Sequence, residues 1–291
     1  MRLNKSKVSL GPWVLAAPAM LLLISGLAAP LILLFRFSFY AKSGHPFYEP
    51  GTWTTENYES LLGSPYGRGI TAFTVLLGIG LASFSVLTGY PIALFICGLP
   101  KRLKAAAIAC VVLPKLASVL VIVYGLQILL GDTGPVNRFA LALGLIGQPM
   151  PLTHHLVGAF IGEVYLLFPY AVLVMIAAFD RIDLELVPAA RGLGATRWQA
   201  FRRITLPLSL PGVFLAGELC LIWGLAAYIG PLFLGGPEQF TLSIEVQRQT
   251  FVNFHWPRAA AAAVVMLGVM VACLALYLIP ATRLRRKGEP T

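Results

Sequence analysis

Three ionisable residues, Lys115, Glu163 and Glu218, lie well inside long apolar stretches of the sequence. A charge in such a setting is costly unless it is paired or reached by water, so each side chain should face a protein interior or a polar pathway. One interpretation is a structural pair of Lys115 with Glu163 or Glu218. Another is a pathway for a charged solute, in which the excess of acid favours a cation, although Lys115 leaves an anion or zwitterion open. A third is that one of the three lies nearer to water than the apolar stretches suggest.

Aromatic residues accompany these charges. Tyr165, Tyr170, Trp223 and Tyr228 lie in apolar stretches and could hold an amine against the faces of their rings. Packing against lipid or against other helices is the commoner role for such residues. Trp223 and Tyr228 therefore join the three ionisable residues as candidates for lining a substrate pathway.

The sequence contains none of the common catalytic patterns. HExxH, GxSxG and the phosphate-binding GxxxxGK[ST] are all missing. The four cysteines are scattered singly, which indicates neither a metal site nor a disulfide framework. We predict no catalytic residue and no metal site. Glu163 and Glu218 could still form a carboxylate pair, so an intramembrane enzyme stays open as a rival class.

The composition is that of a membrane protein. Hydrophobic residues make up 58% of the 291 residues and charged residues 12%, against about 25% charged in soluble proteins. A transmembrane helix needs roughly 20 apolar residues. Six segments meet this length, at about 12–36, 70–97, 105–130, 154–179, 208–234 and 258–280. The predicted fold is an all-α membrane protein with six transmembrane helices over 12–280, between short tails at 1–11 and 281–291.

Lys and Arg predict the orientation of these spans. Fifteen lie in the two tails and in the loops at 98–104 and 180–207, whereas the opposite loops carry five. Because positive loops stay on the cytoplasmic side, both tails and the 180–207 loop are predicted to be cytoplasmic. The net charge of +10 then follows from membrane topology, and no nucleic acid partner is indicated.

The 180–207 loop should form two short helices around a turn. Asp183 can cap the first helix, and Gly192 and Gly194 allow the chain to reverse. Thr196 can cap the second helix, which runs from Arg197 to Ile204. On that helix Trp198, Phe201 and Thr205 share a face at spacings of three and four residues. Exposed aromatic residues there could fill a groove on a partner, or anchor the loop at the lipid interface.

This loop resembles the EAA motif, which is the cytoplasmic coupling loop of type I ABC-importer permeases (the MetI-like family). The motif is an acid, Ala-Ala, three variable residues, Gly, nine further residues and Ile-x-Leu-Pro. Here the acid position is Pro188, which departs from the family. The residues that the resemblance assigns to contact with the ATPase are Ala189, Ala190, Gly194, Ala195, Trp198, Phe201, Ile204, Leu206 and Pro207.

Further residues resemble the spermidine/putrescine subgroup of these permeases: Tyr228, Leu234-Gly235-Gly236 and Phe254-x-Trp256-Pro257. The resemblance implies a bacterial inner-membrane subunit that forms half of a pathway. Its expected partners are a second permease that is a paralogue of this chain, two copies of an ATP-binding subunit that bind ATP and Mg²⁺, and an external substrate-binding protein. It implies a polyamine or related amine as solute, while an anionic or zwitterionic solute such as a phosphonate or an opine stays open.

Overall fold

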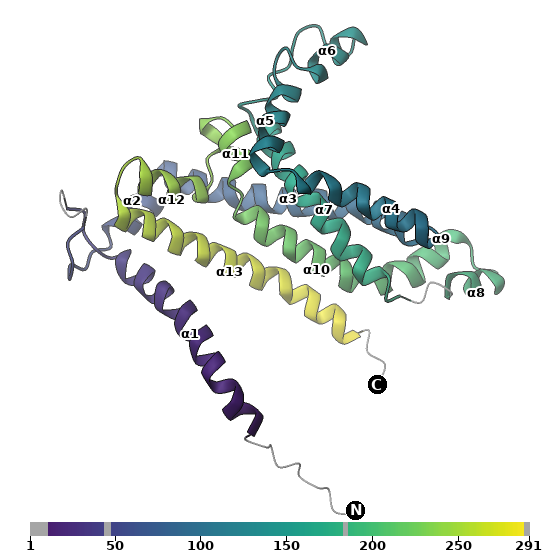
Figure 1. Ribbon diagram of the computed structural model, residues 1–291, viewed down its shortest axis with the longest axis horizontal. Coiled ribbons are helices and arrows are strands. Elements are labelled where there is room, and N and C mark those ends of the chain that lie inside the picture. Colours follow the sequence, from purple (N-terminus) through teal and green to yellow (C-terminus); the bar gives the residue numbers. More distant parts are fainter. Residues whose placement is uncertain (1–10, 44–47, 183–185, 288–291) are drawn as a thin grey trace, which may run out of the picture.

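The computed structural model describes residues 11–43, 48–182 and 186–287, and these are mostly helical, with no strand among them beyond one isolated bridge (Figure 1). The helices are α1 (Gly11–Phe37), α2 (Glu56–Leu62), α3 (Pro65–Cys97), α4 (Lys101–Val112), α5 (Val119–Leu130), α6 (Pro135–Ala142), α7 (Leu156–Phe179), α8 (Leu186–Gly192), α9 (Arg197–Ala200), α10 (Leu206–Leu225), α11 (Ile229–Leu234), α12 (Leu242–Phe251) and α13 (Trp256–Lys287). Short 3-10 or π segments are η1 (Leu113–Leu116), η2 (Phe201–Thr205) and η3 (Pro237–Gln239).

Six helical segments are long and apolar enough to cross a membrane, which confirms the predicted fold class. They are Met20–Phe37, Pro65–Cys97, Val119–Ala142, Leu156–Phe179, Arg197–Leu225 and Trp256–Ile279. Of the predicted tails, residues 1–10 and 288–291 lie outside the described residues. The preceding stretch, 281–287, continues α13 as helix beyond the predicted end of the last span.

The centre of the bundle is formed by α3, α7 and α10. Their buried side chains make one continuous core, which includes Leu81, Leu167, Met175, Phe179 and Leu225. Two glycines let α3 and α10 approach closely, because a Cβ on Gly224 would lie 2.9 Å from the Cα of Gly78. Small residues at such contacts are typical of helix packing in lipid.

Two predicted spans are interrupted. The segment at 105–130 is not one helix: α4 passes into η1, the backbone is extended at Ala117 (ψ 149°), and α5 starts again at Val119. Pro114 lies where α4 passes into η1, because proline offers no N–H to the carbonyl four residues earlier. The segment at 208–234 also breaks, because α10 ends at Leu225 and α11 begins at Ile229.

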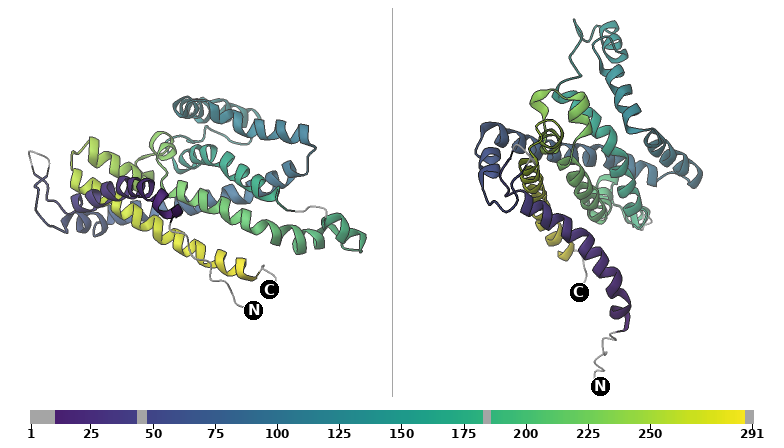
Figure 2. Two further views of the ribbon diagram at one scale, coloured as in Figure 1. Left: turned by 60° about the horizontal axis from the view of Figure 1, so that its bottom comes forward. Right: turned by 60° about the vertical axis from the view of Figure 1, so that its left-hand side comes forward.

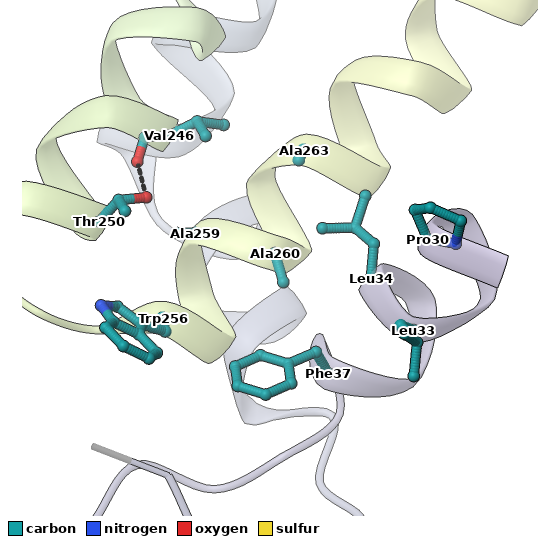
Figure 3. A pocket seen from close by; sticks show the side chains of 10 residues that line it. All are labelled: Pro30, Leu33, Leu34, Phe37, Val246, Thr250, Trp256, Ala259, Ala260 and Ala263. Carbon is teal, nitrogen blue, oxygen red and sulfur yellow. Dashed lines mark hydrogen bonds between the residues drawn. The ribbon is translucent and has the colours of Figure 1, made fainter. Parts of the chain in front are cut away.

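The first helix stands apart from this core. In Figure 1, the C-terminal end of α1 lies beside the start of α13, and α1 diverges from α13 and from the core towards its N-terminal end. Between α1, α12 and α13 lies a groove of about 430 Å³, shown in Figure 3. Its lining is Pro30, Leu33, Leu34, Phe37, Val246, Thr250, Trp256, Ala259, Ala260 and Ala263. The Thr250 hydroxyl donates to the Val246 carbonyl at 2.7 Å and is therefore satisfied within α12. The other lining side chains are aliphatic or aromatic, so the surface of the groove is mainly apolar.

The bundle has two distinct ends. Figures 1 and 2 place α8, α9 and the C-terminal end of α13 at one end, and α2 and α12 at the other. At the first end, Lys104 at the start of α4 forms a salt bridge with Asp180 at the end of α7. Two of the segments predicted to share a side of the membrane, 98–104 and 180–207, therefore lie together.

Candidate functional site

The α8–α9 hairpin, residues 186–205, turns at Gly194. The Gly194 N–H donates to the Arg191 carbonyl at 3.0 Å and the Ala195 N–H donates to the Ala190 carbonyl at 3.1 Å, the two hydrogen bonds of a Schellman motif. This motif needs a left-handed residue at Gly194, whose φ is +92°. Glycine adopts that conformation without the steric cost of a Cβ. Ala190, Gly194 and Ala195 therefore have a local structural reason for their positions in the predicted motif.

The second helix of the hairpin begins where the sequence predicts. The Thr196 side chain accepts the Gln199 N–H at 3.2 Å, and the Gln199 side-chain oxygen accepts the Thr196 N–H at 2.9 Å. This is a reciprocal capping box. Asp183, which could have capped the first helix, lies outside the described residues.

The second helix then continues into α10 through the π segment η2. The Leu206 N–H reaches back five residues to the Phe201 carbonyl. Pro207 explains the shift, because proline offers no N–H to the carbonyl four residues earlier. The hairpin is thus attached to the fifth span by continuous helix, so a force on the hairpin is transmitted to α10 without a flexible joint.

The two aromatic residues of the hairpin have different surroundings. Trp198 is 66% exposed, and its ring stacks on Phe201 with centroids 5.6 Å apart. Phe201 is half-buried and meets Tyr90 of α3 edge-on at 6.3 Å, while Thr205 is buried. The predicted exposed face is therefore corrected to Trp198 alone, because the hairpin lies against α3 and Phe201 anchors it there.

The outer surface of the hairpin combines apolar and basic side chains. Leu193 at the turn is 91% exposed. Its exposed neighbours are Leu186, Pro188, Ala189, Arg191, Arg197 and Trp198. Ile204 and Leu206 are half-buried, and Pro207 is exposed beside them at the start of α10. This surface suits a partner groove that is apolar at its centre and acidic at its rim.

A second candidate site is an open face near the middle of the bundle. The Lys115 ammonium donates to the Leu166 carbonyl at 2.7 Å and lies 4.6 Å from the centre of the Tyr170 ring. Trp223 of α10 packs against Tyr170 with centroids 5.2 Å apart. Tyr170 and Trp223 are 36% and 50% exposed. The structure thus joins Lys115 to Trp223 through Tyr170, and their place in a substrate pathway stays a prediction.

The predicted pairing of Lys115 with an acid is not formed. The salt bridges among the described residues are Lys104–Asp180 and Arg248–Glu245. The Lys115 ammonium is instead compensated by a carbonyl oxygen and an aromatic face. Lys115 and Glu163 attract one another only at longer range, because Glu163 is turned towards α11.

Glu163 caps α11. Its side chain is 6% exposed, and its Oε1 accepts the Gly230 N–H at 2.9 Å and the Tyr228 N–H at 3.2 Å. These N–H groups lie at the start of α11. Because the helix is interrupted after α10, they have no carbonyl acceptor within a helix. The geometry gives the carboxylate a structural task, and the predicted contact with solute stays a prediction. Tyr228 takes part through its backbone, and a pathway role for its side chain stays a prediction.

Glu218 belongs to a different neighbourhood. At about 100° per residue it lies about 140° around α10 from Trp223. On that side its charge acts on Tyr277 of α13, whose hydroxyl donates to the Phe214 carbonyl at 3.0 Å. Glu163 and Glu218 thus have different surroundings, since Glu163 caps α11 and Glu218 lies near Tyr277 of α13.

A buried polar network that the sequence analysis missed lies at the opposite end, around Glu245 of α12. Glu245 is fully buried; its Oε2 accepts Arg248 Nη2 at 2.7 Å and the Tyr66 hydroxyl at 3.1 Å. Gln249 Nε2 donates to Oε1 at 2.7 Å. The i, i+3 spacing of Glu245 and Arg248 was the available signal. The network ties α12 to the start of α3.

We expect Glu245→Ala to destabilise the protein strongly. The alanine variant leaves the buried Gln249 amide without its acceptor, which costs about 1–3 kcal/mol. Arg248 and Tyr66 also lose their shared partner. The melting temperature of the assembled complex in detergent should fall by several degrees. Glu245→Gln keeps an accepting oxygen and should lie between Glu245→Ala and the wild type. A melting temperature unchanged in Glu245→Ala would contradict the assigned network.

Known proteins match this chain along most of its length. The family model described as "Binding-protein-dependent transport system inner membrane component" matches residues 85–286. The spermidine/putrescine transport system permease protein PotB of Haemophilus influenzae is 28% identical over 260 residues, covering 89% of this chain and 90% of that protein. PotB of Escherichia coli K12 is 29% identical over 261 residues, covering 89% and 94%.

More distant matches have other named solutes. The molybdenum transport system permease protein ModB of Haemophilus influenzae is 31% identical over 183 residues, covering 60% of this chain and 73% of ModB. A crystal structure of a bacterial ABC transporter that imports the acidic polysaccharide alginate superposes with a TM-score of 0.67 at 21% identity, covering 95% and 96% of the two chains. The helical arrangement is therefore shared with a transporter that imports an acidic polysaccharide.

Proposed function

We propose a solute for this chain, which belongs to the family of binding-protein-dependent transport system inner membrane components and is a multi-pass permease of an ABC importer. The proposed solute of its pathway is a polyamine or related amine. The observation that carries the choice of solute is the similarity to two spermidine/putrescine permeases over 89% of the chain. The aromatic face of Tyr170 and Trp223 supports it, because rings attract ammonium groups when water is excluded.

The energy for import is proposed to enter through the α8–α9 hairpin. The chain has no phosphate-binding GxxxxGK[ST] motif, so two copies of a separate subunit bind ATP and Mg²⁺ and dock from the cytoplasm. The exposed Leu193 and Trp198 would fill the partner groove, with Arg191 and Arg197 against its rim. Because η2 joins the hairpin to α10 as helix, movement of the ATP-binding subunit would move the span that carries Trp223.

Two further partners complete the proposed importer. A second permease, a paralogue of this chain, would supply the other half of the pathway and face Lys115, Tyr170 and Trp223. An external substrate-binding protein would deliver solute at the end formed by α2 and α12. In one related alginate importer, the solved complex contains a solute-bound periplasmic protein.

The direct test is uptake by the whole importer in liposomes, with its ATP-binding subunits, second permease and binding protein. We expect ATP-dependent accumulation of radiolabelled spermidine or putrescine. An excess of unlabelled polyamine should compete, and molybdate should not. Accumulation of molybdate or another anion without amine uptake would refute the choice of solute and leave the importer assignment intact.

A second candidate is an importer for an anion. Lys115 is the ionised side chain on the open face, since Glu163 is occupied by α11 and Glu218 faces α13. The similarity to a molybdenum transport system permease over 60% of this chain supports this candidate. For this candidate Lys115→Met should abolish uptake, whereas an amine importer should keep it.

A further inference from the structure

The contacts of Lys115 are those that an amine solute would need. A primary ammonium is bound by hydrogen bonds to oxygen and by aromatic faces. Lys115 uses both, with the Leu166 carbonyl at 2.7 Å and the Tyr170 ring centre at 4.6 Å. Trp223 extends the aromatic surface beyond Tyr170. The ammonium is thus held by neutral groups and has none of the described carboxylates as its ion-pair partner.

We propose that the Leu166 carbonyl and the Tyr170 ring form a subsite for an amine. The Lys115 ammonium occupies this subsite when no solute is bound, and the ammonium of the solute displaces it. This inference rests on the proposed amine function. It assigns Lys115 a regulatory role: the chain's own ammonium competes with the solute at the centre of the pathway.

The local backbone allows such a displacement. Lys115 lies on the four-residue segment η1, and extended backbone at Ala117 and Ser118 separates η1 from α5. Its side chain is a flexible four-carbon stem with a compact charge. Leu116 beside it is 76% exposed, so packing does not enclose η1 on that side. The ammonium can therefore leave the ring without disrupting the core of α3, α7 and α10.

Exchange of one ammonium for another explains how the subsite can be both selective and weak. The solute gains the same carbonyl and ring that Lys115 gives up, so little net free energy is gained and release remains fast. A neutral or anionic solute cannot replace the lost contacts. The freed Lys115 charge also repels the bound solute at short range, which favours onward passage.

The test is the KM for spermidine uptake by the complete importer in liposomes. If Lys115 fills the subsite about nine-tenths of the time, Lys115→Met should lower KM about tenfold, because the apparent affinity scales with the free fraction. Lys115→Gln can still donate to the Leu166 carbonyl and should lower KM less, and Lys115→Arg should stay near the wild type. Lys42→Met, at an exposed lysine outside the bundle, is the matched control.

Tyr170 provides a second, independent variant. Tyr170→Leu removes the ring from solute and Lys115 alike and should raise KM, whereas Tyr170→Phe should not. An unchanged KM in both Lys115→Met and Lys115→Gln, with normal amounts of assembled importer, would overturn the inference. So would failure of both to assemble while Tyr170→Leu leaves KM unchanged. If the wild type does not import amines at all, the proposed function fails instead, so the two failures are distinguishable.

Discussion

Gly194→Val should abolish solute uptake by the assembled importer. Gly194 is held at φ +92° by the Schellman motif, and a left-handed conformation costs about 1–2 kcal/mol for a residue with a side chain. The β-branched valine is among the least tolerant residues there. Relief of this strain would reorient α9 relative to α8 and so displace Trp198 from Leu193. We expect uptake to fall by more than about tenfold, the factor that about 1.4 kcal/mol represents.

The measurement is uptake and ATP hydrolysis in liposomes, together with co-purification of the ATP-binding subunit. Stimulation of hydrolysis by the loaded binding protein should disappear even if the subunit still co-purifies. Gly192→Ala is the matched control, because Gly192 ends α8 with no left-handed φ and open space around its Cβ position. Normal uptake coupled to ATP hydrolysis in Gly194→Val would contradict the proposal that the hairpin contacts the ATP-binding subunit.

Glu163→Ala should cause the second large loss, whereas Glu163→Gln should be tolerated. The alanine variant leaves the amides of Gly230 and Tyr228 without an acceptor in a buried, water-poor site. Each unsatisfied group costs about 1–3 kcal/mol, and α11 would detach from α7. Glutamine keeps the accepting oxygen and removes the charge. This pair of variants therefore separates a structural cap from a carboxylate that binds a cationic solute.

The readouts are the amount of assembled importer in the membrane and the uptake per importer. We expect assembly to be lost in Glu163→Ala and both quantities to be retained in Glu163→Gln. Loss of amine uptake in a fully assembled Glu163→Gln importer would restore the original prediction that Glu163 contacts the solute. We expect Glu218→Gln, in contrast, to lower uptake of a cationic solute, since Glu218 has no capping role among the described contacts.

The sequence by itself was sufficient for the features that depend on short stretches of chain. Six apolar segments of membrane-spanning length predicted the fold class, because a span is decided by its own composition. The resemblance of the 180–207 loop to importer permeases is confirmed by the family match over 85–286. The turn at Gly194 and the helix start at Thr196 could also be predicted, because Schellman motifs and capping boxes involve residues at most five apart.

Only the tertiary structure decided which groups meet. Apolar spans look alike on every face, so the sequence could not reveal that Glu163 faces α11, that Glu218 faces α13 and that Lys115 lies on Tyr170. The burial of Phe201 against Tyr90 depends likewise on a neighbour distant in the chain. A buried charge needs a partner, and the packing of the helices against one another determines which partner it has. This partner cannot be predicted from the local sequence.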